Sequence, residues 1–297
     1  MSAPTRATVA GRAYLDLRNI ARASGRPVDE LLQLYVLEAF LARLSASAYA
    51  QRLVLKGGVL LAAFQERRPT RDIDLQSDAV VSGIQDVLTM ACDIAAIPLD
   101  DGVLFDTASA TAETIREEDP YTGVRVTMTA RLVTARQRFH VDVNVGDPIL
   151  PEPESVAVPR LLGGELRLRG YTLATIYAEK IVTAIARGTV NTRWRDFADI
   201  YLLSRRHTID GSTLAQSVEA VATYRQLALA PLAETLAGYD AIGQQRWSAW
   251  RRRQLLDDRL PTQFAEVISA VIHFADPAIT GKARGRTWQP TNANWSP

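Results

Sequence analysis

The sequence predicts an α+β fold, in which a mixed sheet with flanking helices is followed by a helical C-terminal half. Residues between 102 and 147 alternate apolar and polar side chains, which is typical of strands with one buried face. Beyond Tyr171 the apolar residues instead recur at helical spacing. We therefore expect N-terminal helices and an α/β core over 1–170, a helical domain over 171–275, and a weakly ordered tail, rich in Gly, Pro and polar residues, over 276–297.

The N-terminal part is predicted to begin with helices and to continue with short strands. Segments 5–24 and 28–46 have the pattern of amphipathic helices, and the second carries acidic residues in its first turn. A short strand over 52–56 ends at two glycines and precedes a short helix. A second strand is expected over 72–76, and another amphipathic helix over 79–97.

The rest of the sheet is expected in RVTMTARLV and RFHVDVNV, whose side chains alternate between apolar and polar. Residues 148–170 contain several prolines and glycines, and we expect a connection with one further strand there. The helical half is predicted to break near Gly188, Asp210, Pro231 and Pro261.

The composition excludes several classes of protein. The formal net charge is +1, so the chain is not a bulk polycation, and nucleic-acid binding would need a local basic patch. The single cysteine, Cys92, excludes an internal disulfide and suits a reducing compartment. We find no secretory signal pattern and no apolar run near the roughly 20 residues of a membrane span. We therefore expect a cytoplasmic protein that does not contact membranes.

A pair of glycines, Gly57 and Gly58, lies between the first strand and its helix. Glycines at such a turn allow backbone N–H groups at a helix N-terminus to approach a phosphate closely. The alternative is a tight strand-to-helix turn with no ligand.

The second strand carries an Asp-x-Asp pattern. Asp72 and Asp74 are two residues apart, so they point to the same side of a strand, roughly 6–7 Å apart along the chain. Two carboxylates on one face repel each other unless cations bridge them, and a two-metal site needs such paired oxygen ligands. The alternative is a solvent-facing strand with two acids.

A third carboxylate lies in RFHVDVNV, where His140, Asp142 and Asn144 share one face. If this strand lies beside the Asp-x-Asp strand, Asp142 reaches the same metals. The alternative is a surface strand whose polar side chains face water.

Together these motifs resemble the nucleotidyltransferase fold of the polymerase-β type. In that family a glycine motif holds the triphosphate and three carboxylates hold two metals, which match Gly57-Gly58 and Asp72, Asp74 and Asp142. The family often has Gly-Ser in the first motif, whereas this chain has Gly58. The resemblance then implies that backbone amides, or Lys56 and Thr70, compensate, while Arg71 reaches a phosphate or only braces the strand.

The helical half carries three more candidates. Lys180 lies on the apolar stripe of LATIYAEKIVTAIARG, where a lysine must snorkel, pair with an acid or meet a ligand anion. We expect an apolar residue at this position to be tolerated by the packing. Asp196 and Asp199 are three residues apart on one helical face, where they are solvated, pair with nearby arginines, or belong to a site.

The order KGG, TRDIDL, EKI and RDFADIYLL resembles the AbiEii/MenT family of nucleotidyltransferase toxins over residues 50–205. These are the toxins of bacterial toxin–antitoxin and phage-abortive-infection systems, so the resemblance implies an antitoxin as a partner. It also implies an enzyme that uses Mg²⁺, or alternatively Mn²⁺, and a nucleoside triphosphate (NTP). For mycobacterial members it implies nucleotide addition to the 3′ end of tRNA. By position, the resemblance implies active-site roles for Lys180 and for an aspartate of RDFAD, with Asp199 preferred over Asp196.

A candidate RNA surface lies in RWSAWRRRQLLDDR. Arg251, Arg252 and Arg253 could neutralise phosphates there, and the tryptophans could stack on unpaired bases. The alternative is an ordinary helix with tryptophan in the core and arginine in water.

Three other functions stay open at this point. One is an enzyme of the same fold whose acceptor is a protein or a small molecule. Another is a non-catalytic nucleotide-binding protein, whose signature would be a missing metal carboxylate, and none is missing here. A helix-turn-helix DNA reader is disfavoured, because the basic residues do not concentrate on one short helix.

Overall fold

The computed structural model describes residues 4–77, 83–116, 122–144 and 146–297. The chain divides into two compact units, which we describe one at a time: Met1–Gly146 with Glu154–Gly170, and Asp147–Pro153 with Tyr171–Pro297. The first unit contains a seven-stranded mixed sheet with flanking helices, and the second is mainly helical. The predicted α+β class is confirmed. Within the described residues, no helix is both long and apolar enough to span a membrane.

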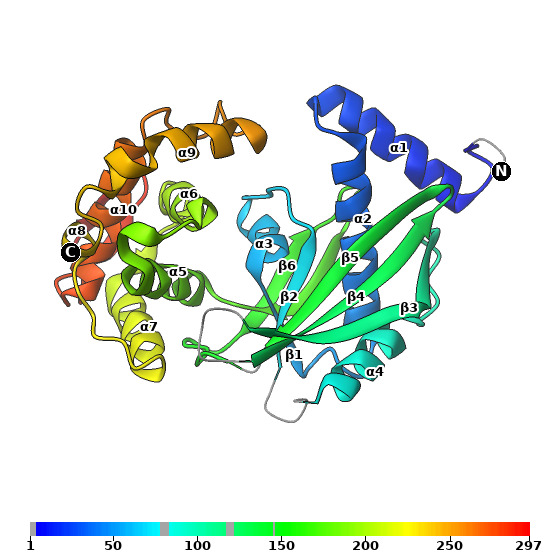
Figure 1. Ribbon diagram of the computed structural model, residues 1–297, viewed down its shortest axis with the longest axis horizontal. Helices are drawn as coiled ribbons and strands as arrows, with labels where there is room; N and C mark the ends of the chain where they lie inside the picture. Colours follow the sequence, from blue (N-terminus) through cyan, green and yellow to red (C-terminus); the bar gives the residue numbers. More distant parts are fainter. Residues whose placement is uncertain (1–3, 78–82, 117–121, 145) are drawn as a thin grey trace. The chain divides into compact units, whose positions relative to one another are not determined.

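The sheet of the first unit brings distant parts of the chain side by side (Figure 1). Its strands are β1 (Leu53–Lys56), β2 (Asp72–Ser77), β3 (Val103–Arg116), β4 (Thr122–Leu132), β5 (Ala135–Asn144), β6 (Glu154–Pro159) and β7 (Glu165–Gly170). Their order is β3-β4-β5-β2-β1-β7-β6. The pairs β2·β5 and β1·β7 are parallel, and the other neighbours are antiparallel. The expected single strand within 148–170 is therefore wrong, because β6 and β7 form a hairpin there.

The helices of this unit are α1 (Val9–Ser24), α2 (Val28–Ala46), α3 (Gly57–Leu60), the 3₁₀ turn η1 (Leu61–Phe64) and α4 (Ile84–Ala95). Helix α1 begins at Thr8, whose side chain accepts a hydrogen bond from the Gly11 N–H, and it ends at Gly25. Residues 79–82 of the helix expected over 79–97 lie outside the described residues.

Helix α2 is not amphipathic as its sequence suggested, because nearly all of its length is buried. Arg43 on this helix is 3% exposed at the side chain and forms an ion pair of 2.6 Å with Asp101, just before β3. Burial of the whole helix is tolerated because its charged side chains find partners of this kind.

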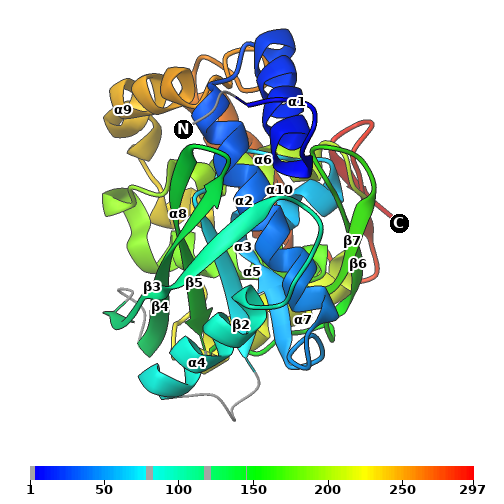
Figure 2. The ribbon, with the colours of Figure 1, turned by 90° about the vertical axis from the view of Figure 1, so that its right-hand side faces the viewer.

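One face of the sheet packs against helices α2 and α4 (Figures 1 and 2). Phe40 of α2 contacts Phe139 of β5 and Phe105 of β3, with ring centroids 5.7 and 6.1 Å apart. Since successive side chains of a strand point to opposite faces, His140 and Asp142 lie on the other face of β5. That second face carries the polar residues discussed below.

The second unit contains α5 (Leu173–Arg187), the 3₁₀ turn η2 (Gly188–Val190), α6 (Trp194–Ser204), α7 (Gly211–Tyr224), α8 (Leu232–Thr235), α9 (Tyr239–Arg253) and α10 (Phe264–Ile279). Each of the four predicted break points falls between two of these helices. Their core is aromatic: Phe264 contacts the rings of Trp194, Phe197, Tyr239 and Trp247.

The predicted weakly ordered tail at 276–297 is wrong, since this segment completes a small sheet. The strands β8 (Ile209–Asp210), β9 (Thr287–Gln289) and β10 (Asn294–Ser296) pair in the order β10-β9-β8. Trp288 and Trp295 are 2% and 6% exposed, and both rings pack on Phe274. The tryptophans outweigh the Gly- and Pro-rich composition because burying a large aromatic side chain contributes more than a few flexible residues cost.

Candidate active site

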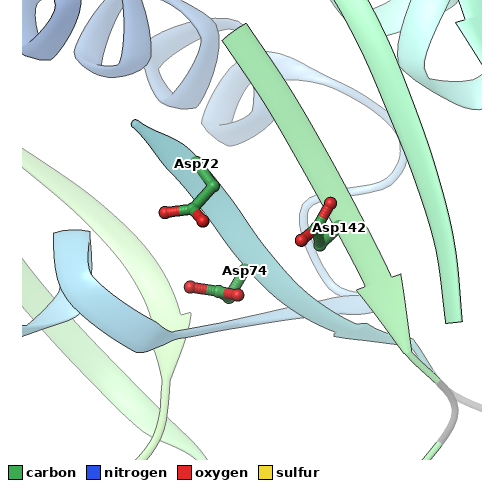
Figure 3. Close-up of side chains that lie close together, drawn as sticks. All are labelled: Asp72, Asp74 and Asp142. Carbon is green, nitrogen blue, oxygen red and sulfur yellow. The ribbon is translucent and has the colours of Figure 1, made fainter. Parts of the chain in front are cut away.

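Three carboxylates converge on the polar face of the sheet (Figure 3). In the register of the parallel pair β2·β5, Asp72 lies opposite His140 and Asp74 lies opposite Asp142. Each of Asp72, Asp74 and Asp142 offers a carboxylate oxygen, and these oxygens all lie within 4.8 Å of one another. Residues that are far apart in the sequence thus form one acidic cluster.

Asp142 has a partner that the sequence did not reveal. Arg125 of β4 donates from Nε and Nη2 to the two carboxylate oxygens of Asp142, at 2.8 and 2.6 Å. Asp142 is only 3% exposed, so the bidentate pair compensates a buried charge and fixes the orientation of its carboxylate. These hydrogen bonds raise the pKa of Arg125 above its ordinary value. The signal was the position of Arg125 on the polar face of RVTMTARLV, but only the register places it opposite Asp142.

His140 lies beside the cluster, opposite Asp72 in the register of the two strands. Its Nδ1 is 2.8 Å from the hydroxyl of Thr127 on β4. Burial, followed by the positive charge of Arg125, lowers the pKa of His140 below its usual value. A neutral imidazole adds no charge to the cluster at neutral pH.

Gly57 approaches the cluster more closely than any other residue type could. Its φ is +68°, and a Cβ atom placed on it would lie 1.8 Å from Oδ2 of Asp74. At Gly58 a Cβ atom would lie 2.7 Å from Oγ1 of Thr70. Gly57 is therefore explained by the carboxylate strand, and Gly58 by Thr70, which precedes that strand.

The residues next to the glycines also face this strand. Thr70 donates from Oγ1 to Oδ1 of Asp72 at 2.9 Å. Lys56 lies opposite Asp74 in the β1·β2 register. The Arg71 side chain is exposed, while its carbonyl accepts a 3.3 Å hydrogen bond from Gln33 of α2. The five residues predicted to bind nucleotide thus surround β2 at its start.

A separate charged cluster lies within the second unit. Lys180 of α5 donates from Nζ to Asp196 at 2.7 Å and to Asp199 at 2.8 Å, and Arg193 donates to Asp196 at 2.6 Å. The sequence left Lys180 to snorkel, to pair with an acid or to meet a ligand anion, and in the structure it pairs with acids. Burial alone would raise the pKa of Asp196, but Lys180 and Arg193 outweigh burial and hold that pKa well below its usual range.

The candidate RNA-binding arginines of α9 are not equivalent. Arg251 is 9% exposed; it donates to the carbonyls of Asp257 and Leu260 and pairs with the Asp257 carboxylate at 3.0 Å. It holds the turn after α9, so its assignment to RNA is corrected. Arg252 and Arg253 are exposed.

Comparison with known proteins decides the family. Residues 39–270 match the family described as nucleotidyl transferase AbiEii toxin, type IV TA system. The chain belongs to the AbiEii toxin family. A search of curated proteins found no significant match.

One solved structure supports the fold of this AbiEii-family chain. An H. pylori protein assigned as a nucleotidyltransferase superposes with a TM-score of 0.51 at 14% identity, covering 85% of this chain and 97% of its own. JHP933 from Helicobacter pylori, also 14% identical, covers 84% of this chain and 94% of its own with a TM-score of 0.49. The family assigns nucleotidyl transfer within a toxin–antitoxin system, and so implies an antitoxin partner.

The acidic cluster of this AbiEii protein fits a hard divalent cation. Its donors are carboxylate oxygens alone, the ligands that Mg²⁺ prefers, whereas zinc sites are mostly built from Cys and His. The cluster also carries excess negative charge, which a cation would offset. Asp72, Asp74 and Asp142 are therefore the residues that could hold the metal.

Proposed function

We propose that this AbiEii-family protein is a Mg²⁺-dependent enzyme that transfers nucleotides from an NTP to RNA, with the 3′ end of tRNA as the acceptor. The observation that carries the proposal is the convergence of three carboxylates on β2 and β5 beside the Gly57 turn. A polymerase-type site needs such a cluster next to a triphosphate-binding turn.

In the proposed reaction, Asp72, Asp74 and Asp142 hold Mg²⁺ or Mn²⁺. When bound, these cations would activate the attacking hydroxyl and neutralise charge at the α-phosphate as pyrophosphate leaves. Arg125 holds the Asp142 carboxylate in place while the reaction proceeds.

The triphosphate would be held by Gly57, Gly58, Lys56, Thr70 and Arg71. Gly58 stands where related enzymes often have a serine, and the Thr70 hydroxyl lies 2.7 Å from the position that a side chain at 58 would occupy. We infer that the Thr70 hydroxyl takes over the phosphate contact of the missing serine. To donate to a phosphate, the Thr70 hydroxyl would turn its proton away from Asp72, which now accepts it.

Lys180, Asp199 and Asp196 enter the proposal through the motifs EKI and RDFAD. Their mutual ion pairs keep a partly buried ammonium and two buried carboxylates in one fixed arrangement. We propose that this cluster is needed for activity, with Asp199 preferred over Asp196 on the resemblance of the motif RDFAD.

The acceptor is the least constrained part of the proposal. A 3′ hydroxyl is the group that polymerase-type sites activate, and the resemblance to MenT proteins favours tRNA. Arg252 and Arg253 are exposed and available for RNA phosphates. We further propose that the enzyme acts in the cytoplasm, where tRNA and NTPs are present, and that an antitoxin restrains it.

The test incubates purified protein with total RNA, Mg²⁺ and each α-³²P-labelled NTP in turn, and separates the products by size. We expect label in RNA of tRNA size, and none when EDTA is present. Because loss of a residue that only supports a metal ligand costs about 10–100-fold, Asp72→Asn and Asp74→Asn should each lose at least ~100-fold.

Asp100→Asn is the matched control, since Asp100 is an exposed acid of the same unit and should transfer normally. Expression of wild type should stop growth, and expression of Asp72→Asn should not. Label only in protein or small molecules would reject RNA as the acceptor. A folded Asp72→Asn protein that labels RNA at the wild-type rate would reject the metal site itself.

A further inference from the structure

An open polar pocket lies on the sheet beside the carboxylates and is used by none of the roles above. It has a volume of about 470 Å³ and is formed by strands β3, β4 and β5. Its lining consists of hydroxyl side chains and two arginines: Ser109, Thr111, Thr127, Thr129, Arg136 and Arg138.

The pocket is continuous with the acidic cluster through the strand register. Thr111 pairs with Thr127, Thr127 with His140, and His140 with Asp72, so one row of side chains crosses four strands. Along β5, Arg138 lies four residues before Asp142, roughly 13 Å away at the rise of an extended strand. Both side chains point to the same face.

The chemistry of the lining fits an anion. Arg136 and Arg138 are exposed, and neither has a carboxylate partner among the residues that the structure describes. The hydroxyl of Thr127 is engaged by His140, and that of Ser109 donates to the Asp106 carbonyl at 2.7 Å. The guanidinium groups are left to supply charged donors, which suit phosphate geometry.

The pocket lies apart from the glycine turn that is proposed to hold the triphosphate. In the sheet order β3-β4-β5-β2-β1, the glycine turn follows β1, and the carboxylates lie on β2 and β5. The pocket lies on β3–β5, on the other side of the carboxylates from Gly57. In a transfer reaction the acceptor must approach the reacting centre from a different side than the leaving pyrophosphate.

We propose that this pocket binds a backbone phosphodiester of the acceptor RNA strand and so places its 3′ hydroxyl at the carboxylates. Arg138 and Arg136 neutralise the negative charge of the phosphate. Without them the three carboxylates would repel it. The inference rests on the proposed function, since it takes the acceptor to be RNA.

The test compares wild type with the double variant Arg136→Gln/Arg138→Gln by equilibrium binding of labelled tRNA over a range of salt concentrations, and by transfer kinetics. Loss of this phosphate contact should weaken binding on the order of 10-fold at low salt and lower the slope of log K against log salt by about 0.7. The KM for RNA should rise, while the KM for NTP stays unchanged. Arg138→Lys in the otherwise native chain should keep the slope.

Arg167→Gln is the matched control, because Arg167 is an exposed arginine of β7 whose partner, Glu165, is also exposed. It should bind tRNA as wild type does, and melting curves should show that all variants are folded. Equal tRNA affinity and salt slope in the double variant would overturn the inference, whether or not the wild type labels RNA. A rise in the KM for NTP would also overturn it, by showing that the anion is the triphosphate. If wild type labels no RNA at all, the proposed function fails in its own assay.

Discussion

Gly57 lies where the glycine turn packs against the carboxylate strand. Its φ of +68° costs an L-residue about 1–2 kcal/mol, and a Cβ atom would overlap Asp74. Both constraints act on one position, so we predict that Gly57→Ala displaces the Asp74 carboxylate. Transfer should fall at least ~10-fold, since loss of a residue that supports a metal ligand has about this cost, and the melting temperature should fall too.

The chain contains a matched control for this substitution. Gly25 has the same φ of +68° but no heavy atom within 4 Å of an added Cβ atom. Gly25→Ala should therefore show only the backbone strain of about 1–2 kcal/mol, with full transfer activity. Equal activity of Gly57→Ala and Gly25→Ala would mean that the Asp74 position is not needed for transfer.

At the scale of elements, helices α5 and α6 are joined by the buried pairs of Lys180 with Asp196 and Asp199. The sequence suggested that an apolar residue at 180 would be tolerated, but the structure predicts otherwise. Removing one partner of a buried ion pair costs about 3–5 kcal/mol, because the other charges stay buried without compensation. We expect Lys180→Met to be destabilised by this amount in chemical denaturation at pH 7.

The contribution of Asp196 to the stability of the fold depends on pH with a defined sign. The pKa of Asp196 is depressed in the folded state, so its stabilisation is present above the unfolded pKa of about 3.9 and is lost as pH falls further towards the folded value. Without Lys180, burial favours the protonated form of Asp196 more strongly, so lowering the pH should harm Lys180→Met less than wild type. The difference in unfolding free energy between wild type and Lys180→Met should become smaller as the pH is lowered from 6 to 3.

Lys282→Met provides the control in the same unit, since Lys282 is exposed. It should change the unfolding free energy by no more than about 0.5 kcal/mol. If Lys180→Met is as stable as this control but inactive, Lys180 acts through a ligand and its ion pairs contribute nothing to the fold.

For the whole molecule, the acidic cluster predicts that stability depends on the metal. A ligand that binds only the folded state stabilises it by about 2.7 kcal/mol at 100 times its Kd. For a unit of this size that corresponds to a melting shift of roughly 5–10 °C. Because the chain has two compact units, we expect the shift in one transition of a calorimetric scan with Mn²⁺ and a non-hydrolysable NTP.

The double variant Asp72→Asn/Asp74→Asn should lose this shift while keeping its metal-free melting temperature. A shift of the same size in the double variant would place the metal elsewhere in the molecule. Mg²⁺ should give a smaller shift than Mn²⁺ at equal concentration, since affinities of divalent ions for N and O ligands rise along the first-row series and Mg²⁺ loses its water reluctantly.

Local sequence rules determined much of this protein. A period of two places Asp72 and Asp74 on one face of a strand, and a period near 3.6 defines the helices beyond Tyr171, because both periods follow from backbone geometry alone. The glycine pair and the order of the motifs were likewise enough to indicate the family. Each period and each motif depends on neighbours within a few residues, so each can be read directly from the sequence.

Tertiary structure decided which distant groups meet. The pairing of β4 with β5 directs Arg125 to Asp142, and the contact between α5 and α6 brings Lys180 to two acids. Neither pairing follows from local periodicity, because strand register and helix packing are set by the summed burial of many side chains. Tertiary contacts likewise direct Arg251 to the turn after α9. They also order the C-terminal segment, where buried tryptophans outweigh a composition that predicted disorder.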